Sequence, residues 1–126
     1  MATHSPQLIA GDTAFMLELF LKGLIVHLVA DWFLQSDWMS KNKVSLLHPA
    51  AWVHSGIHTI GNLFVFDPVV AIGLGISHLL IDTRKPLIWL RQIFQQNPKG
   101  DVTMVFEIWQ DQAAHLILLA VAALIN

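Results

Sequence analysis

The chain has 126 residues, of which 55% are hydrophobic and only 13% are charged, and its formal net charge is −2. A soluble domain carries about 25% charged residues, so this composition excludes an ordinary water-exposed surface and predicts an integral membrane protein. The few Lys and Arg form no basic run, so nucleic acid is not expected as a partner, and the absence of Cys excludes disulfides, thiolate metal sites and a cysteine nucleophile.

The apolar segments predict one all-α domain, a four-span transmembrane helical bundle with up-down-up-down topology. A span needs about 20 mainly apolar residues. The candidate spans cover about residues 14–34, 50–66, 69–85 and 103–125. Each of them contains ionisable side chains, so each qualifies as a span only if these side chains face protein.

Prolines mark the helix boundaries after the first span. Residues 36–49 read as a polar loop, and Pro49 and Pro68 suit the first helical position of the second and third spans. Pro86 should end or kink the third span. Residues from about 86 to 96 then mix apolar side chains with Arg and Gln, which predicts an interfacial helix between spans three and four.

The basic residues predict the orientation in the membrane. Six of the seven Lys and Arg lie between spans one and two or between spans three and four: Lys41, Lys43, Arg84, Lys85, Arg91 and Lys99. Short loops rich in Lys and Arg stay in the cytoplasm. We therefore expect a multi-pass protein of the bacterial inner (cytoplasmic) membrane, with both termini outside.

Each predicted span carries one pair of ionisable residues four positions apart. On a helix, this spacing puts both side chains on one face, about one turn apart. The pairs are His27 and Asp31, His54 and His58, His78 and Asp82, and Asp111 and His115. In the predicted orientation all four pairs lie at one depth near the cytoplasmic leaflet, so the eight side chains can converge on one site.

Five His and three Asp without sulfur ligands suit one or two divalent ions, Zn, Fe or Mn. Two such ions would activate a water and stabilise a phosphoryl or acyl transition state. Glu107 lies one turn before Asp111, and we take both as catalytic candidates, Glu107 as a general base or an extra ligand. Gln35, Asp37 and Gln112 are candidates for contacts that support the ligands or the substrate. Without a metal, the His–Asp pairs would simply satisfy one another.

Other polar residues are expected outside this site. Glu18 and Lys22 are four residues apart, about half a helical turn around from His27 and Asp31. They form either a self-satisfied ion pair or a contact face for a homo-oligomer or a partner membrane protein. His48 precedes Pro49 and is expected to be solvent-exposed in the loop.

Four motifs carry a family resemblance: HLVADWFLQSDWM at 27–39, WVHSGIH at 52–58, ISHLLID at 76–82 and DQAAH at 111–115. With them, nearly the whole chain resembles the small bacterial and phage membrane proteins grouped as domain of unknown function 3307. HSGIH and HLLID also resemble the membrane-bound metal-dependent hydrolases, which are likened to zinc-dependent phospholipase C. This second resemblance implies phosphoester hydrolysis.

The leading functional hypothesis is a membrane-embedded metal-dependent hydrolase of a lipid or amphiphilic phosphoester or ester at the cytoplasmic leaflet. The first alternative is a proton- or metal-ion-coupled transporter, which needs polar residues across the whole membrane. The outer halves of spans two to four offer only Asn62 and small residues. The second alternative is a small cofactor-binding or accessory subunit of a larger membrane complex.

Overall fold

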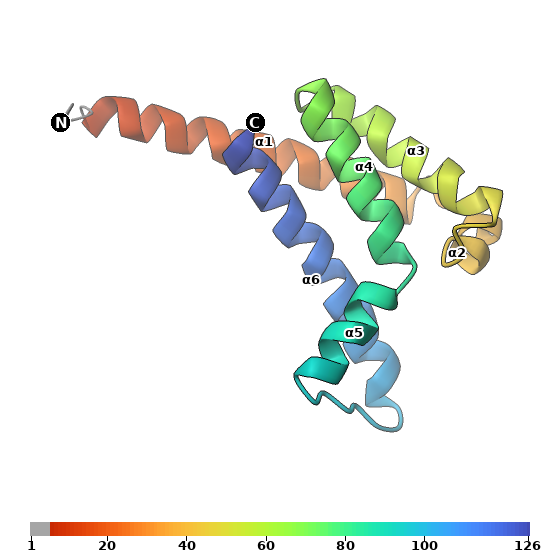
Figure 1. The fold of residues 1–126 in the computed structure, drawn as a ribbon. Coiled ribbons are helices and arrows are strands. Elements are labelled where there is room, and N and C mark those ends of the chain that lie inside the picture. The colour runs from red at the N-terminus through yellow and green to blue at the C-terminus, as the bar shows by residue number, and fades with distance from the viewer. Residues whose placement is uncertain (1–5) are drawn as a thin grey trace.

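A computed structural model describes residues 6–126, and this part of the chain is entirely helical (Figure 1). It contains six helices and no strand: α1 (Pro6–Trp32), α2 (Asp37–Asn42), α3 (Pro49–Leu63), α4 (Pro68–Asp82), α5 (Lys85–Ile93) and α6 (Val102–Ile125). The all-α prediction is confirmed for these residues.

The helix boundaries follow local signals in the sequence. Pro49 and Pro68 begin α3 and α4, as predicted, because a missing N–H costs nothing at the first helical position. α1 begins at Pro6, well before the expected start near residue 14. The segment predicted as a loop contains α2, whose N-cap residue Ser36 accepts a hydrogen bond from the Met39 N–H at 3.3 Å.

α3 and α4 form an antiparallel hairpin whose helices lie in close contact (Figure 1). A Cβ atom at Gly75 would overlap the Thr59 side chain, and the Ser55 hydroxyl donates to the Gly75 carbonyl at 2.7 Å. A Cβ atom at Gly61 would lie 2.6 Å from Cγ1 of Val26 on α1. The missing glycine side chains therefore allow three helices to approach closely within one turn of His58 and His78.

The apolar core lies where α1, the α3–α4 turn, α4 and α6 meet. Its buried residues are Leu19, Phe66, Ala71, Leu74, Leu119, Ala122 and Ala123. The backbone N–H of Asp67 in this turn donates to Oδ1 of Asn126 at 2.8 Å, which ties the turn to the end of α6. The core closes one side of the region that holds the polar pairs.

Two helices, α1 and α6, are long and apolar enough to cross a membrane. In each, only 22% of the most apolar 18-residue stretch is buried inside the protein. α3 and α4 have 15 residues each, which is about 22 Å at 1.5 Å per residue. The structure thus has two helices of spanning length where the sequence analysis expected four.

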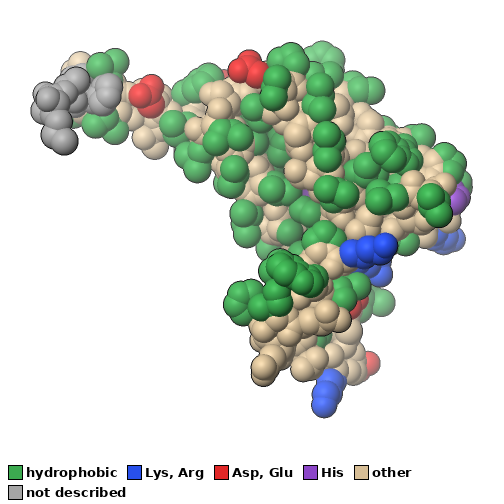
Figure 2. All heavy atoms as spheres, in the orientation of Figure 1, with side chains coloured by type: hydrophobic (Ala, Val, Ile, Leu, Met, Phe, Trp, Pro, Cys, Tyr) green, Lys and Arg blue, Asp and Glu red, His purple; other side chains and the backbone are tan. Residues whose placement is uncertain are grey.

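Apolar side chains cover much of the visible surface, while Lys and Arg gather around α2 and α5 (Figure 2). On α4, Ile72, Ile76 and Leu80 are exposed, whereas His78 and Asp82 are buried. This distribution is the reverse of that on a surface helix of a soluble protein, which turns its polar side outward.

Candidate metal centre

Four helices bring the predicted polar pairs together into one cluster. The buried histidines are His27 on α1, His54 and His58 on α3, His78 on α4 and His115 on α6. His54 and His58 are 0% and 2% exposed, and the Asp31 and Asp82 side chains are 6% and 4% exposed. Side chains that can ionise are rarely buried to this extent unless they are paired or bind a metal.

Asp31 lies at the centre of the first group of candidate ligands. Its Oδ1 is 2.8 Å from Nε2 of His58, 3.1 Å from Nε2 of His54 and 3.8 Å from Nε2 of His78. Each of these four side chains places one ligand atom within 4.8 Å of all the others. Three imidazole nitrogens around one carboxylate oxygen exceed what its lone pairs can accept with good geometry, and they suit a shared cation.

The second group consists of His78, Asp82 and His115, so His78 belongs to both groups. Nε2 of His78 is 3.2 Å from Oδ2 of Asp82, and Nε2 of His115 is 3.7 Å from Oδ1 of Asp82. These last two atoms are buried and have no hydrogen-bond partner. A Zn²⁺ ion takes N and O ligands at about 2.0–2.2 Å, so an ion between them would satisfy both.

Hydrogen bonds from α6 orient two of the imidazole rings. Nδ1 of His115 lies 2.8 Å from the Asp111 carbonyl oxygen, so it carries the proton and leaves the Nε2 lone pair for a ligand. Nε2 of His27 lies 3.0 Å from Oε1 of Gln112, and Nε2 of Gln112 donates to Oδ2 of Asp111 at 3.2 Å. Gln112 therefore supports the cluster as predicted, and His27 donates to it instead of joining either ligand group.

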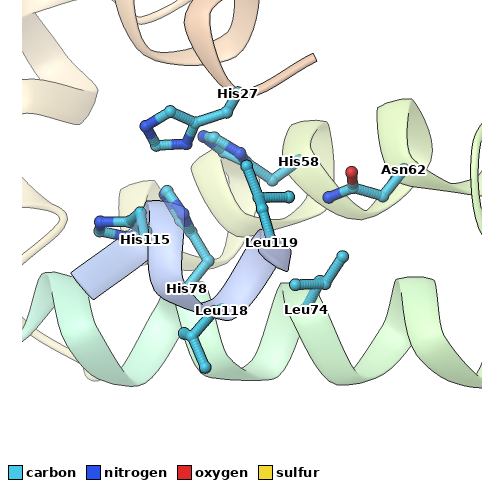
Figure 3. Close-up of a pocket in the computed structure, with 8 residues that line it drawn as sticks. All are labelled: His27, His58, Asn62, Leu74, His78, His115, Leu118 and Leu119. Carbon is cyan, nitrogen blue, oxygen red and sulfur yellow. The ribbon is translucent and has the colours of Figure 1, made fainter. Parts of the chain in front are cut away.

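A small cavity of about 20 Å³ lies on the apolar side of the cluster. Figure 3 shows the rings of His27, His58, His78 and His115 gathered around it from four helices. Asn62, Leu74, Leu118 and Leu119 line the rest. The volume is enough for about one water molecule, and Leu74 and Leu119 also belong to the apolar core.

A much larger cleft of about 700 Å³ lies on the other side and reaches Asp82. It runs between the end of α1, α2, α5 and α6. Asp111 and Glu107 line it, but neither belongs to a ligand group. Oε1 of Glu107 pairs with Nη2 of Arg91 at 3.3 Å. The structure therefore places both catalytic candidates in the cleft, and only six of the eight predicted ligands form the two ligand groups.

The remaining predicted residues lie as follows. Gln35 lines the cleft, and its buried Oε1 has no hydrogen-bond partner. Asp37 is exposed in the first turn of α2, and it is not among the residues that line the cleft. His48 is half-buried rather than exposed, because its Nδ1 caps α3 by accepting from the Ala50 N–H at 3.1 Å. Glu18 and Lys22 pair with each other and are both more than half exposed.

Lys43 is a neighbour of the cluster that was not predicted from the sequence. Its Nζ lies 3.5 Å from Oδ1 of Asp82, and its side chain is only 17% exposed. Lys43 follows α2, and no periodic pattern links it to α4. The one available signal was its place in a basic loop at the depth of the polar pairs.

The fold and the site define a class: an all-helical protein with two apolar helices of membrane-spanning length and a buried His/Asp cluster that can hold a metal ion. Within this class, the chain belongs to the DUF3307 family, described as protein of unknown function, whose sequence model matches residues 19–126. The predicted family is confirmed.

No curated protein and no solved structure matches the chain. The resemblance to membrane-bound metal-dependent hydrolases finds no support in these comparisons.

Proposed function

We propose that the protein is a membrane-embedded, metal-dependent hydrolase of an amphiphilic phosphoester or ester. The distribution of side chains between interior and surface supports insertion in a membrane. The ionisable side chains of the cluster are buried, while large apolar side chains such as Val69, Ile72 and Ile76 are exposed. An apolar surface of this extent is stable where lipid replaces water.

In the proposed topology, α1, α3, α4 and α6 cross the bacterial inner membrane and α5 lies in the cytoplasmic interface. The gathering of Lys and Arg near α2 and α5 supports this orientation (Figure 2). α3 and α4 are shorter than the hydrocarbon core of about 30 Å. They would be accommodated by thinning of the bilayer around the hairpin, with both termini outside.

We further propose that the cluster binds one or two divalent ions, Zn, Fe or Mn. The observation that carries this proposal is the placement of three Nε2 atoms, from His54, His58 and His78, within 3.8 Å of Oδ1 of Asp31. Imidazole and carboxylate ligands suit these three metals. His115 Nε2 and Asp82 Oδ1 lie 3.7 Å apart without a hydrogen bond, and they support a second ion beside the Lys43 ammonium, which is 3.5 Å from Oδ1.

The large cleft is the reason to propose catalysis as well as binding. A divalent ion in the cluster would polarise a phosphoryl or carbonyl oxygen and activate a water. Asp111 and Glu107 line the cleft near the ligand Asp82 and can accept the proton that the water loses. The water oxygen then bonds to phosphorus or carbon, the ester bond breaks, and the leaving oxygen takes a proton.

The apolar closure of the cluster favours a hydrolase over a transporter. Beyond the small cavity, Leu74 and Leu119 join the apolar core that ends at the α3–α4 turn. A transport path would need polar groups through this layer.

Elemental analysis of the detergent-purified protein tests the metal centre directly. Wild type should hold Zn, Fe or Mn near one or two equivalents, and His54→Ala should lose it because His54 contacts both carboxylates, Asp31 and Asp82. The matched control is His48→Ala, which removes an imidazole outside the cluster. Wild type without metal after supplementation would refute the metal centre. If the protein binds metal but releases no phosphate or fatty acid from lipid substrates, the hydrolase is refuted and the metal centre stands.

A further inference from the structure

The cleft beside the cluster is lined by three cationic side chains and by three carboxylates, Asp82, Glu107 and Asp111. Lys43, Arg84 and Arg91 line it, and they come from the segment after α2, the α4–α5 junction and α5. Lys43 lies 3.5 Å from Oδ1 of Asp82 and Arg91 pairs with Glu107. Arg84 pairs with no carboxylate in the described part of the chain, and its place on the cleft lining favours an anion that enters the cleft.

Arg91 is held in place by neighbouring side chains. Its Nη1 donates to Oε1 of Gln110 at 3.0 Å, and its Nη2 pairs with Oε1 of Glu107 at 3.3 Å. Gln110 in turn donates to Oε1 of Gln96 at 3.1 Å. The Arg91 side chain is only 13% exposed. A guanidinium fixed in this way loses little conformational entropy when it binds a ligand.

Arg84 differs from Arg91 because it is exposed and makes no ion pair among residues 6–126. Its backbone is left-handed, with φ of 64°, a conformation that is uncommon for a residue other than glycine. This turn joins α4 to α5 two residues after Asp82. Arg84 therefore places an uncompensated positive charge on the cleft wall close to the ligand groups.

One part of the cleft wall is apolar. Trp32 on α1 and Met104 and Ile108 on α6 line it, and all three are at least half exposed. Apolar side chains of this kind can pack against a hydrocarbon chain. The cleft thus offers cationic side chains for an anionic head group and an apolar wall for a hydrocarbon chain, beside the carboxylates Asp82, Glu107 and Asp111.

We propose that the cleft binds the phosphate monoester head group of an amphiphile, with Arg84, Arg91 and Lys43 contacting the phosphate. The apolar chain lies against Trp32, Met104 and Ile108. The planar fork of Arg matches phosphate oxygens in a bidentate manner. Arg84 has no carboxylate partner among the described residues, so it supplies the positive charge that a dianionic head group would neutralise better than a zwitterionic one. This inference rests on the proposed function, because it names the substrate class of the proposed hydrolase. The experiment that tests it measures binding alone.

A binding assay without turnover tests the proposal. The probe is fluorescently labelled phosphatidic acid in dodecyl maltoside micelles, followed by anisotropy with the purified full-length protein. Arg84→Gln should weaken binding at least about tenfold, because a charge-assisted hydrogen bond contributes that much affinity. The matched control is Lys85→Gln, which removes the same charge from the next residue, outside the cleft lining. Arg84→Lys should weaken binding less than Arg84→Gln does, because it keeps the positive charge but loses the bidentate fork.

Competition identifies the ligand class. Dodecyl phosphate should displace the probe at concentrations at least about tenfold lower than dodecylphosphocholine does, which is the size of one charge-assisted contact. It should also compete at lower concentrations than inorganic phosphate, because inorganic phosphate has no hydrocarbon chain to pack against the apolar wall. Equal competition by dodecylphosphocholine, or equal loss of binding in Arg84→Gln and Lys85→Gln, would overturn the proposal. Preference for inorganic phosphate would also overturn it, since the apolar wall would then be irrelevant.

The two proposals fail in different ways. Metal and hydrolysis with unchanged binding in Arg84→Gln would refute the phosphate cleft and leave the hydrolase standing. Selective binding of the probe without metal or hydrolysis would refute the hydrolase and leave the phosphate cleft standing.

Discussion

Nε2 of His78 lies 3.1 Å from Nε2 of His54, and both side chains are buried. Two imidazole nitrogens at this distance either share one proton or direct both lone pairs at a common cation. Asp31 and Asp82 lie on either side of this pair, with Oδ1 of Asp31 and Oδ2 of Asp82 3.1 and 3.4 Å from the His54 nitrogen. The contact joins the two candidate ligand groups into one site.

Replacing His78 by alanine should remove nearly all bound metal, because His78 belongs to both ligand groups. Replacing His115 by alanine should remove only the ion of the second group, or about half of the metal if two ions bind. Elemental analysis of the two variants beside wild type measures both effects. Wild-type metal content in His78→Ala would contradict the assignment.

Gly75→Ala should destabilise the α3–α4 hairpin, because the new Cβ atom would overlap Thr59. Overpacking of this kind costs about 1–3 kcal/mol. The matched control is Gly73→Ala on the same helix, where nothing lies within 4 Å of the new atom. It should be neutral or stabilising by up to about 1 kcal/mol. Thermal unfolding in detergent compares them, and equal stability of the two variants would show that the close approach is unimportant.

Glu107→Gln should keep the metal and lose hydrolytic activity. Glu107 lines the cleft outside both ligand groups, so metal content should not change. Loss of a general base typically lowers the rate about 10²–10⁴-fold. Phosphate release from phosphatidic acid in mixed micelles, with elemental analysis of the same samples, measures both quantities. Full activity would leave Asp111 as the remaining candidate base, and parallel loss of metal would make Glu107 a ligand.

The proposed topology predicts opposite labelling of two single-cysteine variants, which the absence of native Cys makes unambiguous. Lys41→Cys on α2 should react with a membrane-impermeant maleimide only in inverted vesicles. Phe64→Cys, at a position 87% exposed in the α3–α4 turn, should react only in right-side-out vesicles. Reaction of both from one side would show that the short hairpin does not cross the membrane.

Much of the helical pattern could be predicted because its signals are local. Pro49 and Pro68 mark helix starts through their fixed φ and missing N–H. α2 escaped prediction because a helix of six residues has no periodicity to detect, although Ser36 is a typical N-cap residue. The predicted spans at 50–66 and 69–85 end later than α3 and α4 do, because an apolar run does not reveal where a helix stops.

The members of the candidate site could be predicted because each pair lies four residues apart on one helix face, as with His78 and Asp82. Their separate roles could not. Gln112 engages the ring of His27 from a position 85 residues away, and Lys43 reaches Asp82 from another helix pair. Such contacts depend on how helices cross and on side-chain rotamers, which a helical pattern leaves open.

The sequence by itself determined the helices other than α2, the apolar exterior and the set of polar side chains that must face inward, because each follows from spacing and hydrophobicity along one segment. Only the tertiary structure decided that Asp31 gathers three imidazoles, that His27 supports the cluster, and that Asp111 and Glu107 face the cleft. The physical reason is the close approach of helices at Gly61 and Gly75, which fixes distances between residues that no local pattern relates.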